Sequence, residues 1–187
     1  MMSAMTQPPL PQRFLEAAAG YAGKRMPPVE RWNPDYCGEI DMRIARDGRW
    51  FYMGTPITRL PLVKLFATIL RCDPERYVLV TPVERVGITV EDAPFLAVEM
   101  DDAPDGRLAF RTNLDEVVLA GDEHPIRFEL DETGGLKPYI RIRGDLWARF
   151  TRSLALELVE RLEEDAAGRL GLRVGEAFFA VPDVEQG

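Results

Sequence analysis

Arginine and aromatic side chains alternate along two short segments of the chain. Arg43, Trp50 and Tyr52 belong to the first segment, and Tyr139 and Arg143 belong to the second. Guanidinium groups bind phosphate and carboxylate in a bidentate manner, and aromatic rings beside them can stack on a base. This combination favours the binding of a small anionic ligand such as a nucleotide. The structural interpretation of the same residues is cross-strand ion pairing and amphipathic packing.

Two further arginines, Arg59 and Arg149, each stand where an apolar helix is expected to begin. A cation at this position meets the positive end of the helix dipole, which disfavours it. We therefore expect a partner for each, either an acidic side chain or an anionic ligand. The predicted ligand-binding set is Arg43, Trp50, Tyr52, Arg59, Tyr139, Arg143 and Arg149.

The motifs of the common catalytic machineries are absent from the sequence. It contains no glycine-rich phosphate loop, no GxSxG and no HExxH, and its single histidine is His124 in an acidic loop. Cys37 and Cys72 form no CxxC motif, so no zinc site is expected. We predict no catalytic residues, no metal and no cofactor. The alternative is an enzyme with an unrecognised carboxylate or arginine site, in which acidic groups such as Glu84 or Asp92 converge with raised pKa values.

Composition places the chain among ordinary globular proteins and restricts its partners. The 187 residues are 46% hydrophobic and 29% charged, with a net charge of −8. Residues 1–92 carry a net charge of +1 and residues 93–187 carry −9. This balance argues against duplex DNA and anionic membranes as partners and favours an anionic ligand on the first half. Without a secretory signal or a long apolar run, and with two isolated cysteines, a cytoplasmic location is expected.

Hydrophobic periodicity and turn signals predict mostly short strands with three helices. The helices are expected at 11–22, 60–71 and 147–167, with Val159 among the inward-facing residues of the last. The strands are expected at 41–46, 50–53, 77–81, 86–90, 95–100, 108–112, 117–120, 126–130, 139–143, 170–174 and 177–181.

The two halves of the chain share an order of elements. A hairpin, a glycine, a helix and a second hairpin occur at 41–90 and again at 126–181, and an offset of 90 residues sets Gly54 and Arg59 against Gly144 and Arg149. We predict an α+β fold built from a duplicated β-β-α-β-β unit. The expected domains are an N-terminal arm with a short helix (1–30), a first subdomain (31–92) and a larger second subdomain (93–187).

Three stretches of the sequence carry a resemblance to a known family. They are RWNPDYCGEIDMRIARDGRWFYMGTPITR, YVLVTPVERVGITVEDAPF and PYIRIRGDLWARF. Together they resemble the bacterial domain-of-unknown-function family 1285, over residues from about 28 to 181. The resemblance implies a duplicated α+β fold of two packed domains, the second superficially like pleckstrin-homology folds. It also implies a role in signalling through a ligand at the domain interface, but no activity.

The sequence as a whole predicts a cytoplasmic regulatory module rather than an enzyme. Its expected ligand is a small anion of nucleotide type, bound at the interface between the two subdomains, with a protein partner in a signalling pathway. A protein-interaction module is the remaining alternative. It would use sheet edges or the N-terminal arm, and it predicts a contiguous exposed apolar patch of more than roughly 400 Å².

Overall fold

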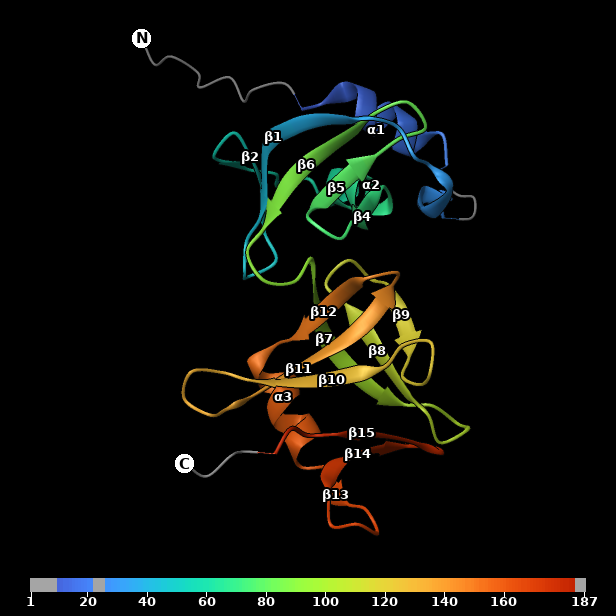
Figure 1. Ribbon diagram of the computed structural model, residues 1–187, viewed down its shortest axis with the longest axis vertical. Helices are drawn as coiled ribbons and strands as arrows, with labels where there is room; N and C mark the ends of the chain where they lie inside the picture. The colour runs from blue at the N-terminus through green and yellow to red at the C-terminus, as the bar shows by residue number, and fades with distance from the viewer. Residues whose placement is uncertain (1–9, 22–25, 184–187) are drawn as a thin grey trace. The chain divides into compact units, whose positions relative to one another are not determined.

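The computed structural model describes residues 10–21 and 26–183 (Figure 1). The chain divides into two compact units, Met1–Asp92 and Ala93–Gly187. Each unit combines helix with a mainly antiparallel six-stranded sheet. The expected α+β class is therefore confirmed.

The described residues of the first unit form two α-helices, a 3-10 turn and six strands. In chain order these are α1 (Gln12–Ala19), η1 (Val29–Arg31), β1 (Tyr36–Ile44), β2 (Trp50–Tyr52), β3 (Thr55–Pro56), α2 (Leu60–Thr68), β4 (Leu70–Cys72), β5 (Tyr77–Val80) and β6 (Arg85–Val90). The sheet order is β3-β2-β1-β6-β5-β4. Strands β1 and β6 pair in parallel at the centre, and an antiparallel meander extends to each side.

The second unit repeats this sheet and adds a helix and a small second sheet. Its elements are β7 (Phe95–Asp102), β8 (Leu108–Thr112), β9 (Val117–Leu119), β10 (Ile126–Leu130), β11 (Leu136–Arg143), β12 (Leu146–Phe150), α3 (Arg152–Val159), β13 (Glu163–Glu164), β14 (Leu170–Val174) and β15 (Ala177–Ala180). The large sheet has the order β10-β11-β12-β7-β8-β9, and β13, β14 and β15 form the small one. Strands β12 and β7 are the parallel pair at its centre.

The two large sheets confirm the duplication and correct its register. In both, the first and last of six strands form the central parallel pair, so β1 corresponds to β7 and β6 corresponds to β12. This correspondence differs from the expected 90-residue offset. Helix α2 lies between the third and fourth strands of its sheet, whereas α3 follows the sixth strand. The resemblance between Arg59 and Arg149 is therefore one of local pattern and not of equivalent position.

The helix expected at 147–167 is wrong at 147–151 and at 160–167. Residues 146–150 form β12, in which Leu146, Ala148 and Phe150 are buried while the residues between them are partly exposed. This alternation is the strand period of two. The helix begins after Thr151, whose hydroxyl accepts a hydrogen bond from the backbone N–H of Leu154 (3.4 Å). An N-cap of this type fixes a helix start more firmly than apolar periodicity does.

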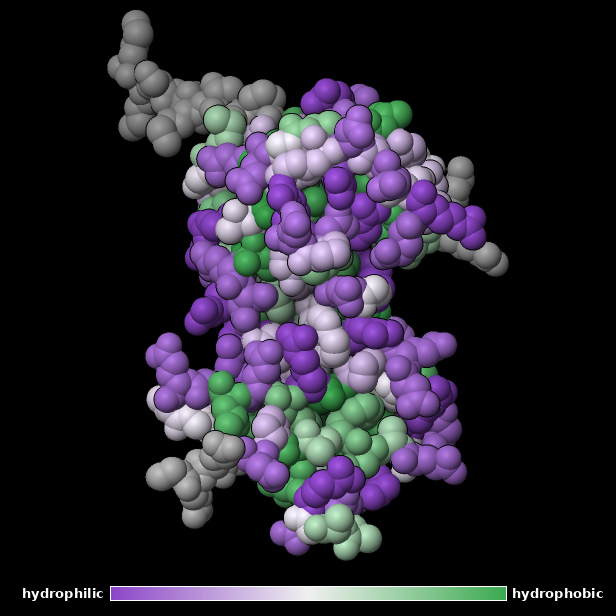
Figure 2. Space-filling model, in the orientation of Figure 1, coloured by the Kyte–Doolittle hydropathy of each residue, from purple (hydrophilic) through white to green (hydrophobic). Residues whose placement is uncertain are grey.

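Aromatic side chains organise the core of each unit. In the first unit Trp50 stacks on Phe66 of α2, with ring centroids 6.3 Å apart and planes at 15°, and α1 packs against α2. In the second unit Phe110 and Phe150 lie 5.1 Å apart. Hydrophobic side chains also reach the surface of the second unit on the face that shows β10, β11 and β15 (Figures 1 and 2). None of the described helices is long and apolar enough to cross a membrane.

Candidate functional site

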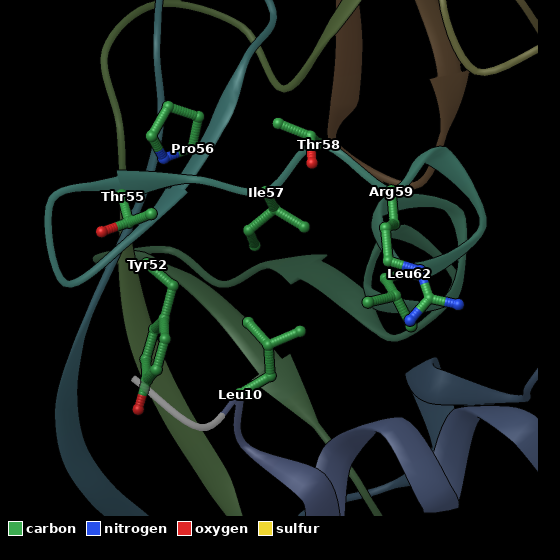
Figure 3. Close-up of a pocket in the computed structure, with 8 residues that line it drawn as sticks. All are labelled: Leu10, Tyr52, Thr55, Pro56, Ile57, Thr58, Arg59 and Leu62. Carbon is green, nitrogen blue, oxygen red and sulfur yellow. The ribbon is translucent and has the colours of Figure 1, made fainter. Parts of the chain in front are cut away.

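Tyr52 and Arg59, two of the predicted ligand-binding residues, line one pocket of the first unit (Figure 3). The pocket has a volume of about 70 Å³, which suits a phosphate- or carboxylate-sized group. Its lining is Leu10, Tyr52, Thr55, Pro56, Ile57, Thr58, Arg59 and Leu62. Hydroxyl groups and a guanidinium therefore share the wall with apolar side chains.

A tight turn after β2 brings these residues together. Met53 and Gly54 both adopt positive φ angles, 50° and 80°, a conformation that favours glycine at the second position. The turn returns the chain so that Thr55 pairs with Tyr52. The backbone N–H of Ile57 then donates to the carbonyl of Trp50 (2.8 Å), which holds the segment leading to α2 against β2. Residues close in sequence thus form most of the pocket, and Leu10 completes it from the N-terminal segment.

Arg59 occupies the N-cap position of α2 with an extended backbone. Its carbonyl accepts hydrogen bonds from the N–H groups of Leu62 (3.0 Å) and Val63 (3.3 Å), while its side chain is exposed. Most arginines of the chain form ion pairs, but no described carboxylate lies within ion-pair distance of this guanidinium. The sequence predicts either an acidic side chain or an anionic ligand as the partner of Arg59. No acidic side chain takes this place among the described residues.

A larger groove adjoins the pocket between α1 and α2. Its volume is about 470 Å³, within the range of small-molecule sites. Leu10, Arg59 and Leu62 line both spaces, and Leu15 and Leu65 add apolar surface to the groove. Glu16 is the acidic side chain in its lining. The combined site suits a ligand with a small anionic group and a larger, less polar body.

Trp50 and Tyr139, expected as stacking surfaces, pack in the cores of their units. Their exposed fractions are 1% and 2%. Trp50 faces α2, and the guanidinium of Arg127 lies over the Tyr139 ring at 4.8 Å from the centroid. Neither ring offers a face to a ligand in this structure. The physical reason is that large aromatic side chains contribute most to a core when they are fully buried.

Arg43 and Arg143 form ion pairs with carboxylates, as the structural interpretation of these residues predicts. Arg43 binds Glu91 (2.6 Å) and lies over the Phe51 ring, 4.4 Å from its centroid. The backbone N–H of Arg46 also donates to Glu91, and together these bonds lower the pKa of the Glu91 carboxyl.

Arg143 forms an ion pair with Glu116 and lies 5.3 Å from the centre of the Phe95 ring. Arg149, the last of the predicted set, lies on β12 and lines a groove beside α3. Of the seven predicted residues, the structure thus brings Tyr52 and Arg59 into one pocket.

Sequence reasoning missed a buried ionic network at the edge of the first sheet. Arg71 binds Asp73 (2.7 Å) and also donates to the backbone carbonyls of Val29 (2.6 Å) and Trp32 (2.7 Å). Arg85 binds the same Asp73 carboxylate at 2.6 Å. Burial alone would raise the pKa of Asp73, but the hydrogen bonds from both arginines outweigh it and hold that pKa below its ordinary value. The network fastens the segment before β1 to the sheet.

The carboxyl groups of the described residues do not show the pattern of an acid catalyst. Each one whose pKa is displaced has it lowered, by arginine side chains, hydroxyl groups or backbone N–H groups. Glu84, a candidate in the enzymatic alternative, lies 3.4 Å from Arg13. The Nδ1 atom of His124 lies 2.9 Å from the carbonyl of Arg141, so this side chain joins a loop to β11.

Comparison with known proteins identifies the family. Residues 27–93 match the model described as "Domain of unknown function (DUF1285), N-terminal domain", and residues 94–181 match "Protein of unknown function (DUF1285), C-terminal domain". The chain belongs to the DUF1285 family. The resemblance drawn from the sequence is thereby confirmed.

Two solved structures of DUF1285 family proteins are similar to this one. The protein from Silicibacter pomeroyi DSS-3 is 43% identical, with a TM-score of 0.82 over 92% of this chain and 96% of that chain. The protein from Shewanella baltica OS155 is 30% identical, with a TM-score of 0.52 over 64% of this chain and 90% of that chain. No curated protein matches the sequence. The family description assigns no activity.

Proposed function

We propose that this DUF1285 protein is a cytoplasmic, ligand-binding regulatory module of a signalling pathway. Its ligand is a small anion of nucleotide type that binds beside Arg59 in the first unit. One observation carries the proposal: Arg59 is an exposed guanidinium that pairs with no described carboxylate and stands between a polar pocket and an apolar groove.

The dimensions of the two spaces indicate how such a ligand would lie. The pocket of about 70 Å³ has room for the anionic group alone, beside Arg59 and Thr58, which carry hydrogen-bond donors, whereas the Tyr52 hydroxyl points away from Arg59 (Figure 3). The body of the ligand would extend into the groove of about 470 Å³, over Leu15 and Leu65. The net charge of +1 on residues 1–92, against −9 on the rest of the chain, supports an anion in this unit.

A thermal-shift screen at low salt tests this proposal. The probes are nucleoside mono-, di- and triphosphates and cyclic dinucleotides, applied to the full chain. A ligand at a hundredfold excess over its Kd adds about 2.7 kcal/mol of stability, so a binder raises the melting temperature in a saturable manner. We expect this rise in the unmodified protein.

Three variants locate the site. Arg59→Ala should abolish the rise, and Arg59→Lys should weaken it because an ammonium group cannot form the bidentate contact. Arg31→Ala is the matched control, because Arg31 is also an exposed arginine of the same unit and lines neither space. A flat screen, or a rise that survives in Arg59→Ala, would overturn the proposal.

A further inference from the structure

A second groove lies entirely within the second unit, beside α3. Its volume is about 570 Å³. Leu136 and Phe150 contribute apolar surface from the sheet, and Leu156 and Val159 contribute it from the helix. The proposed function does not use this groove, and none of its lining residues lines the Arg59 site.

Helix α3 carries two apolar stripes, and only one is buried. Leu154 and Leu158 face the core with exposed fractions of 2% and 0%. Leu156 and Val159, three positions apart and hence on one side of the helix, are 61% and 44% exposed. The expectation that Val159 faces inward is therefore wrong. A helix that covers a core with one side normally presents polar residues on the other, so this second stripe is unusual.

The rim of the groove is positively charged, although the unit that contains it is strongly acidic. Lys137, Arg149 and Arg152 line it, and residues 93–187 carry a net charge of −9. No described carboxylate forms an ion pair with Arg152 or Lys137. Arg152 and Lys137 thus stand at an open apolar surface without an ion pair to a described carboxylate, and the charge of Lys137 also acts on Asp131 in the same lining.

Asp131 is the acidic residue in the lining, and one of its oxygens is hydrogen-bonded within its own turn. One of its oxygens accepts hydrogen bonds from the N–H of Thr133 (2.8 Å), the hydroxyl of Thr133 (2.7 Å) and the N–H of Gly135 (2.7 Å). These bonds lower the pKa of Asp131, led by the Thr133 hydroxyl. This oxygen is therefore committed to the hairpin between β10 and β11, and the charge of Lys137 adds to the lowering of the Asp131 pKa.

We propose that this groove binds an anionic amphiphile, that is, a single alkyl chain ending in a carboxylate or phosphate. The chain lies along Leu136, Leu156 and Val159, and the anionic group lies near Lys137 and Arg152. The positive charges of the rim favour an anionic head group, and the exposed apolar side chains of α3 favour an alkyl tail. A folded protein partner would need to bury about 800 Å² on each side, whereas the groove has the size of a small-molecule site.

Titration of the full chain with decanoate, followed by backbone amide NMR, tests the proposal. Two matched probes separate the contributions: decyltrimethylammonium has the same chain with the opposite charge, and acetate has the charge without the chain. We expect decanoate to shift the amide resonances of residues 152–159 saturably below its micelle concentration. The two matched probes should bind at least tenfold more weakly. Decyl phosphate, as a further probe, distinguishes a preference for phosphate from one for carboxylate.

Variants assign the two parts of the ligand to their contacts. Lys137→Gln with Arg152→Gln should weaken decanoate binding at least tenfold, and so should Leu156→Ser. Leu170→Ser and Arg107→Gln are controls, because Leu170 is an exposed leucine (44%) and Arg107 an exposed arginine, and neither lines the groove. Equal binding of the cationic amphiphile, or binding unaffected by the groove variants, would refute the proposal.

The Arg59→Ala variant distinguishes this proposal from the proposed function. Decanoate shifts at residues 152–159 should persist in it. If Arg59→Ala removes them, the amphiphile binds in the first unit and the α3 groove is not its site. If the nucleotide screen fails while these shifts appear, the proposed function is wrong and this inference stands.

Discussion

Replacing Asp73 by Asn tests the role of the buried ionic network in the first unit. The side chains of Asp73 and Arg71 are 13% and 10% exposed, and that of Arg85 is 25% exposed. An asparagine keeps the shape but leaves one buried guanidinium group (Arg71) and one partly buried guanidinium group (Arg85) without a counter-charge. Breaking such a buried pair costs about 3–5 kcal/mol. We expect the lower end, about 3 kcal/mol, because Arg71 keeps its bonds to the carbonyls of Val29 and Trp32.

Urea unfolding of the full chain as a function of pH measures this effect. The pKa of Asp73 is lower in the folded state than the ordinary value near 3.9, so the carboxylate stabilises the fold above that pH. The difference between the unmodified protein and Asp73→Asn should be full at pH 7 and should shrink as the pH falls through the folded pKa. Asp105→Asn is the control, because its pair with Arg107 is half exposed and should contribute little. A loss at pH 7 no larger than that of Asp105→Asn would refute the reasoning.

Three further predictions concern packing and capping. Gly87→Ala should destabilise the first unit by about 1–3 kcal/mol in urea unfolding, because a Cβ there would lie 2.6 Å from the hydroxyl of Tyr36. Adding Tyr36→Phe to the same chain removes this hydroxyl and should recover part of the loss. Thr151→Ala should cost about 1 kcal/mol through loss of the N-cap bond to Leu154, whereas Thr151→Ser should be nearly neutral by the same measurement. Trp50→Ala should cost about 3–5 kcal/mol, since the ring is 1% exposed; a loss below 1 kcal/mol would show that the ring is not part of the core.

Local sequence signals predicted most of the strands, because these signals act within a few residues. The hairpins at Asp47–Gly48 and Asp105–Gly106 have glycines at φ angles of 87° and 84°, as such turns require. The sequence pattern predicts a helix over residues 147–150 because Trp, Ala, Arg and Phe are compatible with both helix and strand. Their place between β11 and β7 makes them a strand, and pairing between segments far apart in sequence is not encoded locally.

The same distinction between local signals and distant pairing applies to the candidate site. Tyr52 and Arg59 line one pocket because only six residues and one tight turn separate them, which a local pattern can indicate. Arg71, Asp73 and Arg85 meet through the pairing of β4, β5 and β6, so their network could not be read from spacing. Whether an arginine finds a carboxylate, as Arg43 does, or stays available depends on the same tertiary pairing.

The most direct test of the central claim is an amide NMR titration of the full chain with adenosine 5′-monophosphate. We predict saturable shifts for residues 55–62, which line the pocket and begin α2. These shifts should vanish in Arg59→Ala and persist in Arg31→Ala. The absence of shifts at residues 55–62, or shifts that remain in Arg59→Ala, would contradict the assignment of this pocket as the site for a nucleotide-type anion.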